Sequence, residues 1–346
     1  MGTQTFQNTS ARIGKLKGEI LAHAVPVEVL GITGMQRPMP KNSSKTVVFR
    51  RWLPYGSTAS NPNTWGVDAI KHLTQEGVTP AADTLTPQDV EVTMQQFAVL
   101  YSLTDQMEDM HEDGPELADE MKKQTGQRLG LVREMVRYGA LKGCTNKFYA
   151  GGTSRTTVAA KLTLPLLRKV TRSLKANHAK FITGVLAPSA MYNTSAVEAS
   201  FLVFAHTDCE QDIRDLPGFK ETAIYGQRKL AHEQELGSAE SFRFILSPEL
   251  NNIPDAGAAV GSTGLVSTTG ANVDVYPVIV AAQDAWGQVM LRGKESISVT
   301  YIPPGKEDKN DPLGQRGYIG AKNYFAALVL NNGWMSVIEC GVSVLA

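Results

Sequence analysis

The chain has 346 residues, of which 42% are hydrophobic and 20% are charged, as in a globular protein with one large or two ordinary domains. Its 34 basic and 34 acidic side chains cancel, which argues against a strongly basic surface for nonspecific nucleic-acid binding. The N-terminal MGTQTFQNTS has neither a charged start nor an apolar run, and no apolar run reaches about 18 residues, so we expect no signal peptide and no membrane span. The three cysteines, Cys144, Cys209 and Cys340, are too widely spaced to predict a disulfide framework or a zinc site, and we expect the chain to fold in a cytoplasm.

The first 44 residues predict an arm. Residues 1–10 are small and polar, as in a mobile tail. Residues 11–24 carry apolar side chains at helical spacing, and Pro26 ends that pattern. The glycines and prolines that follow indicate an extended, kinked segment. An arm this apolar is expected to lie on a surface, either of its own subunit or of a neighbouring copy.

Two predicted strands then enclose a long excursion. Residues 45–53, KTVVFRRWL, form the first strand, and residues 89–103, DVEVTMQQFAVLYSL, form the second. The apolar alternation slips at Gln95–Gln96, which indicates a bulge or bend. The turn-rich residues 54–88 between them are typical of a functional or disordered loop. We predict a two-stranded flap that extends from the body and requires a partner surface, because such a ribbon is marginal alone.

A single long helix is predicted at about residues 115–143. Pro115 suits the first turn, acidic residues precede basic ones along the segment, and Gly143 is placed to end it. Three internal glycines would each cost about 1 kcal/mol in a free helix, so we expect close packing against other elements. The pattern is typical of a single long supporting helix and equally of an ordinary core helix. Its apolar stripe is Leu117, Met121, Leu129, Val132, Val136 and Ala140, with Thr125 in the remaining slot.

The rest of the chain alternates irregularly between helices and strands. A helix over 163–177 begins with Thr163 as its cap and Pro165 in its first turn, and Thr207 caps a second helix that ends before Pro217–Gly218. Residues 256–272 are rich in Gly, Ser and Thr and are predicted to form a loop. Strands are predicted at 181–186, 201–204, 242–246, 273–282, 299–304, 318–330 and 334–342, the last two joined as a hairpin through Asn331–Gly333. This irregular order favours an α+β fold over a doubly wound one.

No catalytic, cofactor-binding or metal-binding constellation emerges. His232–Glu233 begins a zinc-protease motif, but Leu236 occupies the position of its second histidine. The acidic stretch from Asp105 to Asp113 could bind a cation, although it lacks the order and the central glycine of a calcium loop. A solvated helix start is the favoured interpretation. We therefore predict a non-enzymatic protein without a cofactor.

The order of arm, flap, long helix, α+β body and closing strands resembles the Hong Kong 97-type fold of tailed-phage major capsid proteins. Several segments resemble the major capsid protein family of the coliphage N-four type, and together they run from about residue 11 to the C-terminus. These segments are HAVPVEVLGITG (23–34), QTGQRLGLVREMVRYGALKGCTNKFY (124–149), TDCEQDIRDLPGF (207–219), ELGSAESFRFILSPEL (235–250), DAWGQVMLRG (284–293) and DPLGQRGYIGAK (311–322).

The resemblance implies a domain plan. Residues 1–44 would be the N-terminal arm and 45–90 the extended loop over a neighbouring subunit. Residues 91–152 and 317–346 would form the peripheral domain around the long spine helix, and 153–316 the axial domain. Hexamers and pentamers would build the icosahedral head around double-stranded DNA, so the chain would reside in the virion after assembly in the host cytoplasm. The implied partners are other copies, a portal protein, a separate scaffolding protein, a decoration protein and weakly held packaged DNA, but no membrane.

The flap supplies the predicted intersubunit contacts, because Trp and Arg dominate interface hot spots. These contact residues are Arg50, Arg51, Trp52, Trp65 and Lys71. A cross-link from Lys71 to Asn331 or Asn332 has a precedent in the fold, but no catalytic carboxylate is identifiable here. An encapsulin-like shell enclosing a cargo enzyme is the alternative function, and a soluble enzyme with an unrecognised site is the third.

Overall fold

The computed structural model describes residues 3–4, 26–42, 44–57, 62–74, 76–77, 82, 84–110, 114–184, 197–225, 230–261, 263–293, 297–307 and 311–345. The predicted helix at 11–24 and most of the predicted tail lie outside these residues. Four α-helices are described: α1 (Asp105–Met110), α2 (Gly114–Lys142), α3 (Leu164–Ala176) and α4 (Glu210–Arg214). The fifteen strands are β1 (Thr3–Gln4), β2 (Met35–Met39), β3 (Thr46–Trp52), β4 (Pro87–Thr93), β5 (Gln95–Thr104), β6 (Lys147–Tyr149), β7 (Phe201–Ala205), β8 (Lys220–Glu221), β9 (Glu235–Ala239), β10 (Phe242–Leu246), β11 (Tyr276–Ala281), β12 (Trp286–Leu291), β13 (Val299–Ile302), β14 (Arg316–Val329) and β15 (Met335–Cys340).

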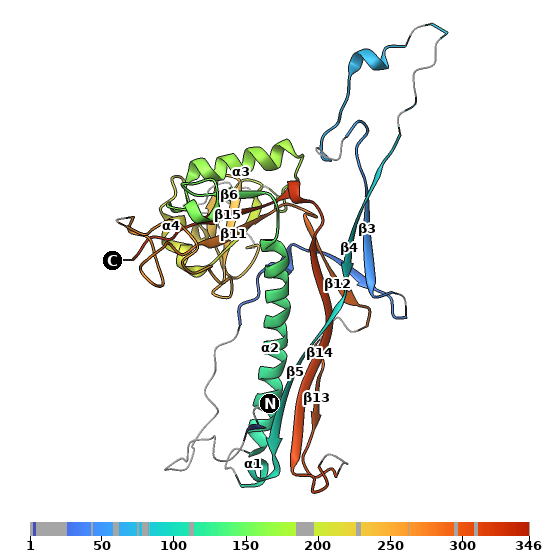
Figure 1. The fold of residues 1–346 in the computed structure, drawn as a ribbon, viewed down its shortest axis with the longest axis vertical. Helices are drawn as coiled ribbons and strands as arrows, with labels where there is room; N and C mark the ends of the chain where they lie inside the picture. The colour runs from blue at the N-terminus through green and yellow to red at the C-terminus, as the bar shows by residue number, and fades with distance from the viewer. Residues whose placement is uncertain are drawn as a thin grey trace.

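The molecule has three parts (Figure 1). A compact lobe contains a seven-stranded sheet of order β6-β15-β11-β7-β10-β9-β8, with α3 and α4 around it. A long leg consists of α2 lying alongside a six-stranded sheet of order β1-β5-β14-β12-β2, with β13 also paired to β14. The flap, built on the β3–β4 ribbon, projects away from both. The strands and the two large sheets confirm the α+β prediction.

The seven-stranded sheet is covered on both faces, which explains its sequence. β7 reads FLVFA and β10 reads FRFIL, and every residue of both is buried. A sheet buried on two sides favours continuous apolar runs over alternation. One core cluster includes Leu167, Val170 and Leu174 of α3, and a second includes Tyr138 and Leu141 at the end of α2. This second cluster joins the lobe to the leg.

The closing strands correct the hairpin prediction. β14 and β15 are not partners: β14 pairs with β5, β12 and β13, whereas β15 pairs with β11 and β6. The residues between them form a 3₁₀ turn at Asn332–Trp334, whose N-cap Asn331 accepts a hydrogen bond from the Gly333 amide at 3.0 Å. The Asn-Asn-Gly sequence supplies a turn, as predicted, but this turn passes the chain from one sheet to the other.

Three further local predictions need correction. The helix after β7 is capped by His206, whose ring accepts a hydrogen bond from the Asp208 amide, and not by Thr207. No strand forms at 181–184, the described part of the predicted strand 181–186. Thr163 occupies the N-cap position of α3 but makes no side-chain capping hydrogen bond. The strands β1, β2, β6, β8, β9 and β12 were not predicted, and β1 lies within the residues predicted as a mobile tail.

The long helix is confirmed as α2, and its buried face is more polar than its apolar stripe. Leu129 and Thr125 are buried, while Leu117, Met121, Val132, Val136 and Ala140 are only partly buried. The positions completing the buried face are Ala118, Gly130, Glu134, Arg137, Tyr138 and Leu141. Apolar periodicity alone could not identify the charged pair among them.

The helix glycines have different surroundings. A Cβ at Gly130 would collide with the Glu28 carboxylate, so the absent side chain lets the N-terminal segment approach α2. A Cβ at Gly139 would meet no atom within 4 Å. Gly139→Ala is therefore expected to raise the free energy of unfolding by about 0.5–1 kcal/mol, the intrinsic helix preference of alanine. Gly130→Ala is the matched control and should give a smaller gain, because the Glu28 carboxylate must move away and loosen its ion pair with Arg137. Denaturant unfolding of both variants checks this, and equal effects would contradict the assigned packing.

The three thiols are free and buried. A hydrogen bond to Cys340 and then burial raise the pKa of Cys209 well above its usual value, and burial raises the pKa of Cys144. Because the thiolate is the reactive form, we expect a thiol reagent at pH 8 to label the native chain far more slowly than the unfolded chain. Cys144 and Cys209 ionise at lower pH in the unfolded chain than in the folded one, so their contribution to stability is full below about pH 8.5 and declines above it. Rapid labelling of one native cysteine would contradict this arrangement.

Candidate functional site

The flap stem has an inward and an outward face. β3 and β4 are antiparallel, with Phe49 opposite Val90 and Val47 opposite Val92. These four residues pack with β2, β12 and β14 in a third apolar cluster, which roots the ribbon on the leg. Side chains alternate along a strand, so Arg51 falls on the same face as Phe49, and Arg50 and Trp52 fall on the other.

The stem carries two polar cross-links. Arg50 donates to both carboxylate oxygens of Asp89 at 2.8 Å, and this hydrogen bond and charge lower the pKa of Asp89. On the inward face, Arg51 donates to Gln88 Oε1 from Nε at 2.8 Å and from Nη2 at 2.5 Å. Partial burial lowers the pKa of the Arg51 guanidinium. The two arginines therefore brace the ribbon before any partner binds.

Beyond the stem, the flap presents apolar side chains to solvent. Trp65 is 60% exposed and Ile70 is 83% exposed. We define the tip patch as the four exposed large apolar residues described at 62–74: Trp65, Val67, Ile70 and Leu73. Trp52 adds a fifth exposed apolar side chain at the end of the stem. A concentration of large apolar side chains on a projecting ribbon is typical of a protein–protein contact surface.

The predicted contact residues therefore divide into three sets. Trp52 and Trp65 lie exposed on the flap, available to a partner. Arg50 is exposed but already paired with Asp89, and Arg51 is half-buried and turned toward the body. The side chain of Lys71 lies outside the described residues. Asn331, considered as a cross-link partner, is buried and hydrogen-bonded to Asn63 of its own chain.

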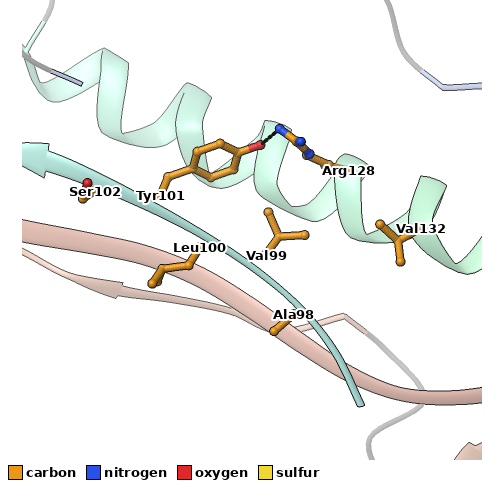
Figure 2. A pocket seen from close by; sticks show the side chains of 7 residues that line it. All are labelled: Ala98, Val99, Leu100, Tyr101, Ser102, Arg128 and Val132. Atoms are coloured by element: carbon orange, nitrogen blue, oxygen red, sulfur yellow. Dashed lines mark hydrogen bonds between the residues drawn. The ribbon is translucent and has the colours of Figure 1, made fainter. Parts of the chain in front are cut away.

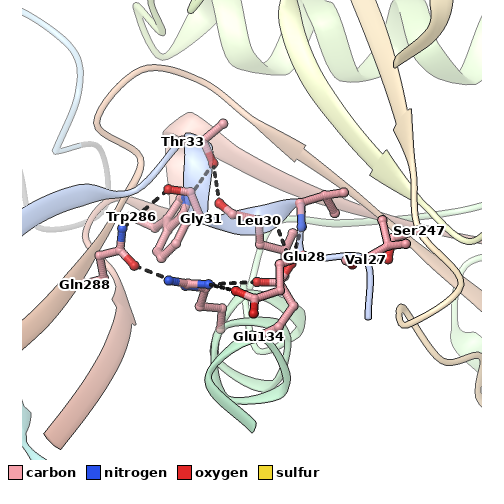
Figure 3. A network of polar contacts seen from close by, with 11 residues as sticks. Val27, Glu28, Leu30, Gly31, Thr33, Glu134, Ser247, Trp286 and Gln288 are labelled. Atoms are coloured by element: carbon pink, nitrogen blue, oxygen red, sulfur yellow. Dashed lines mark hydrogen bonds and ion pairs between the residues drawn. The ribbon is translucent and has the colours of Figure 1, made fainter. Parts of the chain in front are cut away.

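A network of polar contacts anchors the N-terminal segment at the junction of leg and lobe (Figure 3). Glu134 Oε1 accepts from the amides of Val29 and Leu30 at 2.8 and 2.7 Å. Glu134 Oε2 accepts from Arg137 Nη1 at 2.9 Å, and Arg137 Nε donates to Gln288 at 3.1 Å. Both charged side chains of α2 are essentially inaccessible to solvent, so each depends on the other for charge compensation.

The N-terminal segment also contacts both sheets. Ser247, at the end of β10, donates to the Val27 carbonyl at 2.8 Å, and Trp286 of β12 donates from its indole to Thr33 at 2.9 Å (Figure 3). A Cβ at Gly34 would come within 2.6 Å of the Trp286 ring, so only glycine allows this approach. The segment at 27–34 is thus a fixed part of the subunit core. Sequence reasoning missed the network, although the opposite charges at Glu134 and Arg137, three residues apart on a helix, were a usable signal.

A pocket of about 560 Å³ lies between β5 and α2 (Figure 2). It is lined by Ala98–Ser102, Arg128 and Val132, and Arg128 donates to the Tyr101 hydroxyl at 2.7 Å. No histidine or carboxylate is among these lining residues, so the pocket holds no general base for the Ser102 or Tyr101 hydroxyl. It is a feature of the leg surface without a recognisable catalytic arrangement.

The described residues offer neither a metal site nor a membrane-spanning helix. Within the described ranges, no group of three His, Cys, Asp or Glu side chains is placed to hold a metal ion. Of the acidic stretch considered as a cation site, residues 111–113 are not described, and Glu108 accepts a hydrogen bond from the Tyr301 hydroxyl at 3.1 Å. In the part of the chain that the structure describes, no helix has the length and apolar character needed to cross a membrane.

Comparisons with known proteins point in one direction. No family model matches the chain. The major capsid protein of Pseudomonas phage KPP21 is 19% identical over 341 residues, covering 87% of this chain and 85% of that protein. Among solved structures, the capsid of Ralstonia phage GP4 matches with a TM-score of 0.66 and 12% identity over 100% of both chains. The capsid of cyanophage Pam1 matches with a TM-score of 0.59 and 13% identity, covering 96% of this chain and 97% of that one.

These structural matches span the arm, flap, leg and lobe together. The chain has the Hong Kong 97-like fold of tailed-phage capsid proteins, as the order of its sequence elements predicted.

Proposed function

We propose that this chain is the major capsid protein of a tailed double-stranded-DNA phage and that its copies self-assemble, as hexamers and pentamers, into an icosahedral head. One observation carries the proposal: the end-to-end match to the Ralstonia phage GP4 capsid chain includes the projecting flap and the long helix. The sequence similarity to a phage major capsid protein, over 87% of this chain and 85% of that protein, supports it. The finer assignment to the coliphage N-four type rests on the local sequence resemblance.

The flap is the principal contact between copies. Its tip patch and Trp52 are exposed in the single chain, and burial of apolar area stabilises association by about 25 cal/mol per Å². The zero formal net charge limits repulsion between many identical neighbours. A shell held by many such contacts needs only modest affinity at each one.

We propose the same domain plan with two changes, one in each domain. The peripheral domain comprises α2, β5 and β14, and it also takes β12 and β13, since both strands pair with β14. The axial domain comprises the lobe, together with β6 and β15 of its sheet. The arm is residues 1–44 and the extended loop is residues 45–90. A portal protein, a separate scaffolding protein and a decoration protein are the proposed partners, with packaged DNA in weak contact and assembly in the host cytoplasm.

Analysis of particle contents tests the proposal against the encapsulin-like alternative. Particles from infected cells should contain nuclease-protected DNA with this chain as the most abundant protein. Particles that lack DNA and enclose a stoichiometric cargo enzyme would contradict the phage assignment. The phage origin of the similar proteins named above favours the first outcome.

A further inference from the structure

Part of the flap folds back onto the lobe. The loop after β3 closes on itself where Gly56 and Gly66 cross, and a Cβ on either glycine would collide with the backbone of the other. Within this loop, Asn63 is only 9% exposed, in contrast to the solvent-exposed tip patch that follows it. The flap therefore meets its own subunit twice, at the apolar root of the stem and at Asn63.

The Asn63 amide uses its full hydrogen-bonding capacity. Its Nδ2 donates to Asn177 Oδ1 and to Asn331 Oδ1, both at 3.1 Å. Its Oδ1 accepts from Asn331 Nδ2 at 2.8 Å and from Arg51 Nη1 at 3.3 Å. An asparagine amide offers two donors and two acceptor positions, and all four are occupied here. We call Asn63, Asn177 and Asn331 the amide latch.

Both lobe members of the latch are themselves fixed. Asn177 is the C-cap of α3 and donates from its side chain to the Ser173 carbonyl at 2.9 Å, and its own carbonyl accepts from the Trp334 indole at 2.8 Å. Asn331 caps the 3₁₀ turn between β14 and β15. On the flap side, Arg51 links Asn63 to Gln88 and so to both strands of the stem. A continuous path of hydrogen bonds runs from the ribbon to the lobe.

We propose that Asn63 is a positioning residue, which holds the flap of the free subunit at one angle to the lobe before any neighbour binds. The latched arrangement leaves the tip patch exposed, so it presents the contact surface instead of covering it. Without the latch the ribbon would be anchored only at its root. Because the latch fixes the flap beforehand, less conformational entropy is lost when a neighbour binds. The predicted effect of the latch on assembly rests on the proposed function. The position of the flap in the free subunit does not.

A distance measurement on the soluble full-length chain tests the latch directly. A chain with both Ile70→Cys and Ala176→Cys carries one spin label on the flap and one on the exposed end of α3. The native cysteines are buried, so the labels attach selectively to the two introduced cysteines. Pulsed electron paramagnetic resonance should give one narrow distance distribution. Asn63→Ala should broaden it, and Gly333→Ala should do the same from the lobe, since a Cβ at Gly333 would collide with the Asn63 amide.

Trp65→Ala is the matched control, because it removes a tip-patch side chain and leaves the latch intact. Its distribution should remain narrow. A broad distribution in the unmodified flap, an unchanged one in Asn63→Ala, or a broad one in Trp65→Ala would each overturn the proposal.

In assembly, Asn63→Ala should raise the critical concentration about fivefold, as expected for the loss of a buried hydrogen-bonded amide. If neither the parent chain nor any variant assembles, the proposed function fails. The distance distributions still show whether Asn63 holds the flap in place.

Discussion

Replacing Glu134 by alanine is expected to lower the free energy of unfolding by about 3–5 kcal/mol, a large part of the stability of a typical domain. The change leaves the Val29 and Leu30 amides without their acceptor inside the core. It also leaves the buried Arg137 guanidinium with only the more distant Glu28 carboxylate, at 3.6 Å, for charge compensation. Unpaired buried groups of both kinds are strongly destabilising.

Denaturant unfolding of the soluble chain measures this effect, with Asp119→Ala as the control on the same helix. Asp119 pairs with Lys122 at 2.8 Å, but its side chain is 79% exposed, so its loss should change stability by about 0.5 kcal/mol or less. Hydrogen exchange at Val29 and Leu30 should increase in the Glu134 variant alone. Equal destabilisation by the two substitutions would show that the buried network does not anchor the N-terminal segment.

Trp65→Ala is expected to abolish or severely impair shell formation while leaving the subunit folded. Truncation of a hot-spot tryptophan weakens a contact by about 2 kcal/mol or more, which is about 30-fold in the affinity of each contact. The loss recurs at every equivalent contact of a shell. Trp65 is largely exposed, so the thermal unfolding midpoint of the soluble chain should be nearly unchanged.

The control for Trp65 is Leu345→Ala. Leu345 is exposed, and the C-terminus next to it lies on the lobe, on the side away from the flap (Figure 1). Sedimentation of co-expressed chain and scaffold would compare the two variants with the parent. Normal shells from Trp65→Ala, together with defective shells from Leu345→Ala, would move the principal contact from the flap to the C-terminal surface.

The elements that the sequence predicts well are those defined by local patterns. The β3–β4 ribbon, the break before β5 and the long helix α2 each follow from periodicity and end signals within one segment. The pairing of β14 with β5, and that of β15 with β6, depend on residues more than a hundred positions away. A turn sequence between two apolar runs carries no information about which sheet each run joins.

The exposure of the flap residues could be predicted only in part, for a related reason. Tryptophans on an isolated ribbon are readily identified as contacts, and Trp52 and Trp65 are exposed. The inward turn of Arg51 and the latch at Asn63 depend on where the loop folds back onto α3 and the turn at 332–334. Buried polar side chains such as Glu134 and Asn63 have ordinary surface identities in the sequence, and only the three-dimensional arrangement shows that they are enclosed.

Negative-stain electron microscopy of the purified chain, expressed with and without its scaffolding protein, tests the central claim most directly. A major capsid protein should form closed shells, or rings of five and six subunits, in at least one of these conditions. A homogeneous monomer or dimer under both conditions would contradict the account and return the search to an enzyme with an unrecognised site.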